Sequence, residues 1–174
     1  LSSEIRLSSL AGKLSERIRK TLNIAPIAIF LRDDSQVNAY RLYHAEDMPG
    51  DVDDLNHVVA PDAIFSNFDR DLNPLLLLSS SEPVERLRSQ LNRGGLHYVQ
   101  PLRVHRRIIG FWALGKRRNG DFLSTEDLDL IGALSGYAAI AMDNALLYRS
   151  LEGKASELAQ LKAYNEEVVE SITV

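Results

Sequence analysis

The sequence contains no cysteine among its 174 residues. Disulfide bonds, thiolate metal ligands, thiol nucleophiles and chromophores attached through a thioether are therefore all excluded. The absence also fits a reducing compartment, because disulfides form mainly in oxidising environments. We therefore expect a cytoplasmic protein.

Long apolar runs and an excess of positive charge are lacking as well. The longest aliphatic stretches, 27–31 and 75–78, are far shorter than the roughly 20 residues that cross a membrane, so we expect no membrane contact by this segment. The net charge of −4 argues against nucleic acid as a main partner, since phosphate binding needs a surplus of Lys and Arg. The start lacks both a signal-peptide pattern and an initiator Met, which suggests a piece of a longer protein.

What is present suits one globular domain, with 45% hydrophobic and 25% charged residues. Apolar residues at three- and four-residue steps predict a helix over 3–23. The other expected elements are strands at 27–31 and 37–43, an irregular region at 44–73, a short edge strand at 75–78, a helix ending near 92, strands at 96–104 and 108–114, and a helical pattern from Ser124 to the end. Strands joined as hairpins favour an α+β fold with an antiparallel sheet and helices on one side.

Several short motifs follow one another in the second half of the chain. They are Pro-Leu at 101–102, Ile-Ile-Gly-Phe-Trp-Ala-Leu-Gly at 108–115, Phe122 with Glu126-Asp127, and an Ala-rich stretch from 138 that ends in Asn-Ala-Leu-Leu-Tyr at 144–148. In this order they resemble the C-terminal half of GAF domains, and the order of the preceding elements extends the resemblance to roughly 3–150. Gly110 in the middle of a strand would allow close approach of a packed helix.

The resemblance implies a GAF-like central antiparallel sheet of five or six strands, with the N- and C-terminal helices packed on one face. It also implies a regulatory sensory domain at 1–150, whose small-molecule ligand lies between the sheet and the irregular region. Aromatic side chains often line such pockets. The candidates for the pocket wall are Phe65, Phe68 and Tyr98, with core packing an equal alternative for each.

The special activities of the family find little support in the residues. Without cysteine, neither a covalently held tetrapyrrole nor methionine sulfoxide reduction is expected. The Asn-Lys … Phe-x-x-x-Asp-Glu pattern of cyclic-nucleotide-binding members is altered here, and we interpret Lys116 and Glu126-Asp127 as structural. The four histidines have no ligand spacing. We therefore expect no metal, no cofactor and no catalytic residues.

Basic residues gather near the last hairpin. They are Arg103, His105, Arg106, Arg107, Lys116, Arg117 and Arg118. An anion-binding face is one interpretation of this cluster. The simpler interpretation is a solvated hairpin end, because charged turns are common at sheet edges.

The tail carries a heptad pattern, which predicts a coiled-coil linker helix at 151–174. Its a positions are Leu151, Leu158, Asn165 and Ile172, and its d positions are Leu147, Lys154, Leu161 and Val168. An Asn at an a position fixes register in a parallel two-stranded coil. A final helix of about fifty residues would be roughly 75 Å long, which favours a homodimer through the terminal helices over a helix folded back on its own domain.

Residues 165–172 resemble the lead-in helix to a PAS domain in bacterial sensor histidine kinases. The functional hypothesis is therefore a GAF sensory domain of a histidine kinase in a two-component system. Such a domain would bind a small molecule and transmit its state through a dimeric helix. The alternative is a structural dimerisation or relay module without a ligand.

Overall fold

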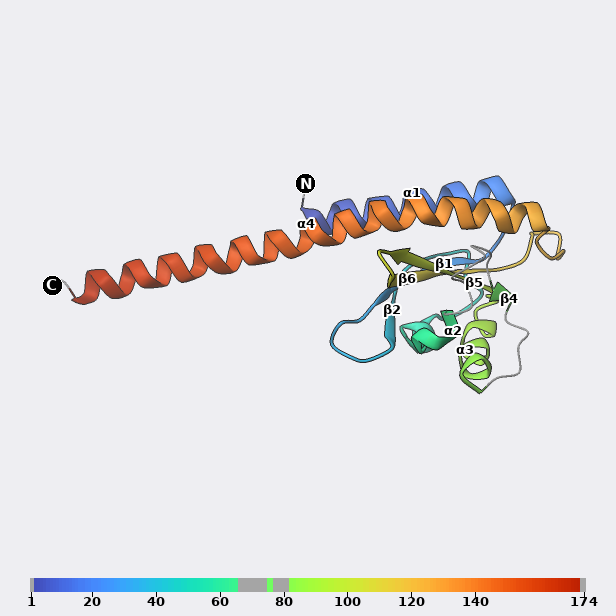
Figure 1. Ribbon diagram of the computed structural model, residues 1–174, viewed down its shortest axis with the longest axis horizontal. Helices are drawn as coiled ribbons and strands as arrows, with labels where there is room; N and C mark the ends of the chain where they lie inside the picture. Colours follow the sequence, from blue (N-terminus) through green and yellow to red (C-terminus); the bar gives the residue numbers. More distant parts are fainter. Residues whose placement is uncertain (1, 66–74, 77–81, 173–174) are drawn as a thin grey trace.

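A computed structural model describes residues 2–65, 75–76 and 82–172 of the chain. In these residues one sheet has a layer of two long helices on one side and shorter helices on the other (Figure 1). The elements are α1 (Ser3–Leu22), β1 (Ile27–Arg32), β2 (Ala39–Glu46), η1 (Asp53–Leu55), β3 (His57–Val59), α2 (Asp62–Phe65), β4 (Leu75–Leu76), α3 (Glu82–Asn92), β5 (Tyr98–Val104), β6 (Arg107–Leu114) and α4 (Thr125–Ile172). This arrangement confirms the expected α+β, GAF-like fold.

The sheet is antiparallel throughout the described strands, with six strands in the order β3-β2-β1-β6-β5-β4. The apolar β1 lies in the middle, as its sequence predicts for a strand covered on both faces. Ile27 and Ile29 of this strand pack towards the terminal helices, whereas Ala28 and Phe30 pack towards α2 and α3. Two apolar cores result, one on each side of the sheet.

Strand β2 begins later and ends later than the sequence indicates. Val37 lies in the turn with 87% of its surface exposed, and Asn38 has a φ of 57°. Asn tolerates this left-handed conformation, so the strand starts only at the next residue. At the other end His44 and Glu46 pair with β1, which removes 44–46 from the expected irregular region.

The last hairpin contains a bulge next to Gly110. Leu102 pairs with Gly110 but the next residue, Arg103, pairs with Ile108, so Ile109 is the extra residue. A Cβ atom at Gly110 would lie 2.2 Å from the carbonyl oxygen of Phe30. The close approach expected at this glycine therefore comes from the neighbouring strand β1 and not from a packed helix.

Helix α4 begins with a reciprocal cap. The Ser124 hydroxyl accepts the backbone N–H of Asp127 at 3.2 Å, and the Asp127 carboxylate accepts the backbone N–H of Ser124 at 2.9 Å. The helix then runs for 48 residues without a break, a length of roughly 72 Å at about 1.5 Å per residue. It passes along the sheet and extends far beyond it (Figure 1).

Helix α1 lies antiparallel beside the first half of α4 (Figure 1). Small and apolar residues of α4 (Ile131, Gly132, Ser135, Ala138, Ala139 and Met142) are buried in this layer. One 18-residue window of α4 has a mean hydropathy of 1.4, enough by composition for a membrane span, but a third of that window is buried inside the domain. Packing on the sheet accounts for the buried part of that apolar character, and the other apolar side chains, such as Tyr137 and Ile140, are exposed.

Candidate functional site

The sheet face beneath α2 carries an aromatic cluster. The Phe30 and Phe111 rings stack with their centroids 4.8 Å apart, and the Tyr40 and Phe65 rings lie 5.1 Å and 5.7 Å from Phe111. All four side chains are fully buried. Phe65, a pocket candidate from the sequence, thus packs in the core of this face.

The other pocket candidates do not join Phe65. Tyr98 is 2% exposed and belongs to the opposite core, below the terminal helices, where its hydroxyl accepts the backbone N–H of Leu123 at 3.0 Å. Alternate residues of a strand point to opposite faces, so Tyr98 and its neighbour Val99 are separated by the sheet. Phe68 lies outside the described residues.

A polar group covers one edge of the aromatic cluster. Arg32 lies over the Tyr40 ring at 5.3 Å, and its Nη2 donates to the Tyr40 hydroxyl at 3.1 Å and to Asp62 at 2.7 Å. Burial, against the nearby Arg32 charge and with a further contribution from Asp62, raises the pKa of Tyr40 to about 12. Tyr40 therefore stays a neutral phenol at physiological pH.

A hollow of about 610 Å³ lies beside α3 on this same side of the sheet. It is lined by Val59, Pro61, Glu82, Arg86, Ser89 and Gln90. The volume falls within the range of small-molecule sites, and the lining mixes apolar surface with charged and amide groups. The sequence analysis did not identify these residues, because two of them lie in the expected irregular region and the other four lie on α3, more than twenty positions later in the chain.

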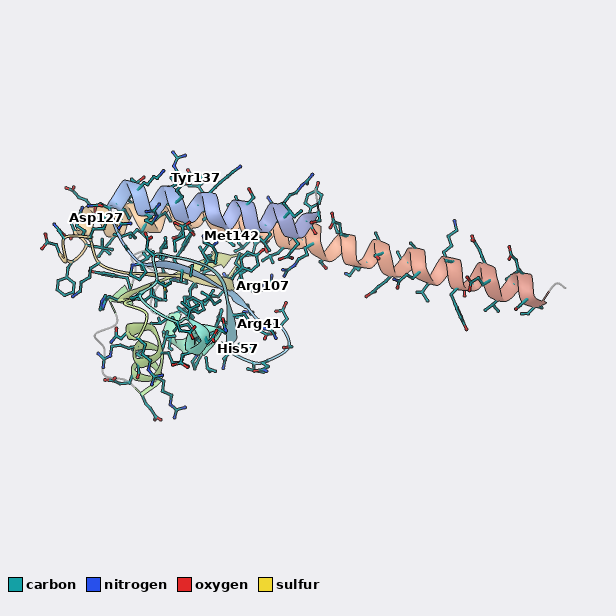
Figure 2. All side chains as sticks on the ribbon, turned by 180° about the vertical axis from the view of Figure 1, so that it is seen from behind. Arg41, His57, Arg107, Asp127, Tyr137 and Met142 are labelled. Atoms are coloured by element: carbon teal, nitrogen blue, oxygen red, sulfur yellow. The ribbon has the colours of Figure 1, made fainter. Side chains whose placement is uncertain are left out.

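The basic residues near the last hairpin separate into two groups in the structure. Arg107 begins the eight-residue strand β6, and Lys116 lies two residues beyond its other end. Figure 2 shows Arg107 and Asp127 at opposite ends of the domain. Arg117 forms an ion pair with Asp127, and Lys116 lies 4.5 Å from the Phe122 ring centroid. The interpretation of the 116–127 group as structural therefore agrees with its contacts.

Asp127 is held ionised by those contacts. Burial alone would raise its pKa, but the Ser124 backbone and hydroxyl and the Arg117 guanidinium outweigh burial and lower it. At the opposite end of the sheet, the Asp33 pKa is far below its usual range. The Ser35 hydroxyl and backbone N–H contribute most, followed by Arg41, and His57 Nε2 lies 3.0 Å from the same carboxylate. Both carboxylates anchor turns.

No group of three or more histidine or acidic side chains that could bind a metal gathers in the part of the chain that the structure describes. His44 Nε2 lies 3.0 Å from Glu46 on the same strand. His97 is partly buried, and burial together with the Lys116 charge lowers its pKa.

The N-terminus of α1 is attached to α4 at the point where α4 leaves the domain. The backbone N–H and the hydroxyl of Ser3 both donate to Glu152, at 3.1 Å and 2.5 Å. One turn away Arg149 donates to Glu4, which also accepts the Tyr43 hydroxyl. We call this group the exit clasp, because α4 has no buried residue beyond it.

Beyond the exit clasp the heptad positions of α4 lie on an exposed helix. Leu151 and Leu158 are 62% and 67% exposed. Among the remaining a and d positions, Leu147, Lys154, Leu161, Asn165 and Ile172 are exposed and Val168 is half-buried. The helix is not folded back on its own domain (Figure 1).

The same heptad continues backwards into the domain, which the sequence analysis missed. Counting back in sevens from the tail gives Leu130, Ala133, Tyr137, Ile140 and Asn144, and each of these is exposed. Tyr137 and Ile140 are 77% and 57% exposed, on the side of α4 that faces away from its buried residues. We call positions a and d from Leu130 to Ile172 the α4 stripe.

Solved structures with a similar fold include GAF domains. The GAF domain/HD domain protein from Geobacter sulfurreducens is 21% identical with a TM-score of 0.62, over 81% of this chain and 94% of that one. The second GAF domain of DevS from Mycobacterium smegmatis is 15% identical with a TM-score of 0.59, over 83% and 99%. The blue-light absorbing form of the PixJ GAF domain from Thermosynechococcus elongatus is 14% identical with a TM-score of 0.57, over 94% and 97%.

A search of curated proteins found no match to this chain. The family model described as GAF domain matches residues 7–144, which include the sheet, most of α1 and the first part of α4. GAF domains are typically regulatory sensory domains of signalling proteins and are generally not catalytic. The chain belongs to the GAF domain family.

Proposed function

We propose that this domain regulates a signalling protein by pairing its α4 helix with that of a second copy, in parallel and in register. The observation that carries the proposal is the α4 stripe, whose leucines are exposed along a helix that is continuous with the core of the domain. Burying each such leucine against a partner contributes about 1.5–3 kcal/mol. The occupant that fits a heptad stripe is a second helix with the same repeat.

Polar residues of the stripe support a parallel pair of identical chains. Asn144 and Asn165 both stand at a positions, three heptads apart, so each would meet its own copy only in a parallel, in-register dimer. Glu157 at g and Lys162 at the following e have no ion-pair partner in the part of the chain described by the structure, and they could pair between chains. Over the full stripe the heptad drifts by about 20° per repeat on a straight helix, so pairing requires a left-handed supercoil.

The proposed signal is a small molecule that binds between the sheet and α3. The hollow of about 610 Å³ beside α3 supports this, because Val59 of the edge strand β3 lines it together with Arg86 and Gln90 of α3. A ligand there biases α4 only if it binds two arrangements of the domain unequally. The output that we propose is the kinase module of a cytoplasmic sensor histidine kinase, in keeping with the PAS-like lead-in at 165–172.

Sedimentation equilibrium tests the pairing. The wild-type domain should be a dimer at micromolar concentration, and Leu158→Asp, which places a charge in the seam, should weaken the dimer at least a hundredfold. Ser156→Asp adds the same charge at position f, on the helix face opposite the seam, and should leave the dimer intact. A wild-type monomer at high micromolar concentration would contradict the proposal.

A second candidate function is a relay module that binds no ligand. The aromatic cluster of Phe30, Tyr40, Phe65 and Phe111 favours it, because these rings fill the sheet face where a ligand would otherwise lie. A thermal-shift screen with nucleotides, haem and small metabolites separates the two candidates. A stabilising compound whose effect is lost in Gln90→Ala supports the sensor, and a screen without any hit supports the relay.

A further inference from the structure

A second hollow, of about 360 Å³, lies where the β5–β6 hairpin meets the end of β1 and the start of α2. Its polar lining consists of Arg32, Asp62, Arg103, His105, Arg106 and Arg107. Four guanidinium groups thus face a single carboxylate among the described lining residues. Guanidinium groups match phosphate and carboxylate oxygens with paired hydrogen bonds.

The turn that presents these side chains has an unusual composition. His105 and Arg106 connect the two strands with φ values of 49° and 67°. A two-residue turn with both φ values positive favours Asn-Gly, because larger residues are strained in this region. His105 and Arg106 therefore lower the stability of the turn relative to Asn-Gly. In return they place an imidazole and a guanidinium at the rim of the hollow.

Arg32 is fixed in place before any ligand arrives. Its Nε donates to the backbone carbonyl of Ile108 at 2.7 Å, and its Nη2 donates to Tyr40 and Asp62. The two N–H groups on Nη1 have no partner among the residues that the structure describes. A rigid donor loses little entropy on binding an anion.

Arg107 connects the hollow to the output helix. Its guanidinium lies 3.6 Å from Asp143 on α4, near the point where α4 leaves the domain (Figure 2). The distance exceeds that of a good hydrogen bond, and the side chain is 65% exposed. An anion in the hollow would therefore compete with Asp143 for this arginine.

We propose that the hollow at the β5–β6 hairpin end binds a small soluble molecule that carries two or more phosphate groups. The site is separate from the hollow beside α3 and does not depend on the pairing of α4. Binding draws Arg107 towards the ligand and so weakens its ion pair with Asp143. Among the described residues, this is the only ion pair between the hairpin tip and α4.

Titration of the ¹⁵N-labelled domain with pyrophosphate, at constant ionic strength, tests the proposal. The backbone amides of 105–107 should show saturable shifts in a 1:1 complex. Arg106→Gly should weaken binding about tenfold, as the loss of a charge-assisted hydrogen bond does, and should raise Tm because glycine adopts the positive φ without strain. The rise in Tm separates lost binding from lost folding.

The matched control is Arg93→Ala, which removes the same charge from a side chain just after α3 that is 68% exposed and lines neither hollow. It should bind pyrophosphate as the wild type does. Equal losses in Arg93→Ala and Arg106→Gly would overturn the proposal, since they would indicate that binding depends only on the net charge of the domain. A last experiment measures binding of the domain to vesicles that contain phosphorylated inositol lipids. A domain that binds these vesicles but shows no response to pyrophosphate would also overturn the proposal.

Discussion

Ser3 and Glu152, which are 149 positions apart in the chain, are joined by two hydrogen bonds from the Ser3 backbone N–H and hydroxyl to the Glu152 carboxylate. This contact ties the first turn of α1 to α4 where α4 leaves the domain. The helix on one side of it packs on the sheet, and the helix on the other side is exposed. The exit clasp is therefore the boundary between the part of α4 that belongs to the domain and the part that projects from it.

Glu152→Ala should release the start of α1. The Ser3 hydroxyl and backbone N–H lower the pKa of Glu152, so this contact stabilises the fold above the ordinary Glu pKa of 4.5 and is lost as pH falls through the lower pKa of the folded protein. Amide hydrogen exchange at residues 3–6 should speed up in the variant and, in the wild type, below about pH 4. Unchanged exchange in Glu152→Ala would mean that the clasp does not hold α1.

Gly110→Ala should destabilise the domain by about 3 kcal/mol. The added Cβ would overlap the Phe30 carbonyl in the centre of the sheet, and backbone cannot move aside there. Gly136→Ala on α4 is the control, because its Cβ meets nothing within 4 Å and alanine favours the helix by about 1 kcal/mol. Urea unfolding of both variants measures the difference, and a neutral Gly110→Ala would contradict the observed register of β1 and β6.

Tyr98→Phe should cost about 1–2 kcal/mol, because it leaves the buried backbone N–H of Leu123 without its acceptor. Tyr164→Phe is the control, since that side chain is 64% exposed and stands outside the α4 stripe, so the free energy of unfolding should not change. If Tyr98→Phe were neutral in unfolding and instead altered ligand response, Tyr98 would belong to a pocket and not to the helix-side core.

Much of the fold could be predicted from the sequence, and the failures have specific causes. The unbroken apolar run at 27–31 and the apolar steps of α1 indicate buried elements whatever their neighbours. The basic residues form two separate groups because the length of β6 lies between them. The residue types alone do not reveal that distance. Tyr98 and Phe65 look equivalent as aromatic residues, because the sequence does not say which face of the sheet the terminal helices cover. The bulge at Ile109 also changes which residues of β6 point to each face of the sheet, and the sequence does not reveal a bulge.

Only the part of the α4 stripe that projects beyond the domain could be predicted from the sequence. From Leu147 onwards the heptad is visible because nothing else requires apolar residues there. Between Leu130 and Asn144 the same heptad is mixed with the residues that pack on the sheet, so the helix appears apolar on all sides. Only burial in the folded domain separates the two faces.

Lys154→Leu should strengthen the proposed dimer. A charged side chain at a d position weakens a coiled-coil seam, and burial of a leucine pair in its place contributes about 3 kcal/mol. Sedimentation equilibrium should then give at least a tenfold tighter dimer, and signalling by the full-length protein should become insensitive to its stimulus. A weaker dimer in Lys154→Leu would place this residue outside the seam.

Cysteine cross-linking along α4 tests the central claim most directly, because the native chain contains no cysteine. Leu151→Cys and Asn165→Cys place a thiol at a positions, and Ser156→Cys places one on the outer face of the same helix. A parallel, in-register dimer predicts rapid oxidation to disulfide-linked dimers at 151 and 165 and none at 156. Equal cross-linking at all three positions, or none at 151 and 165, would contradict the pairing of α4 along its stripe.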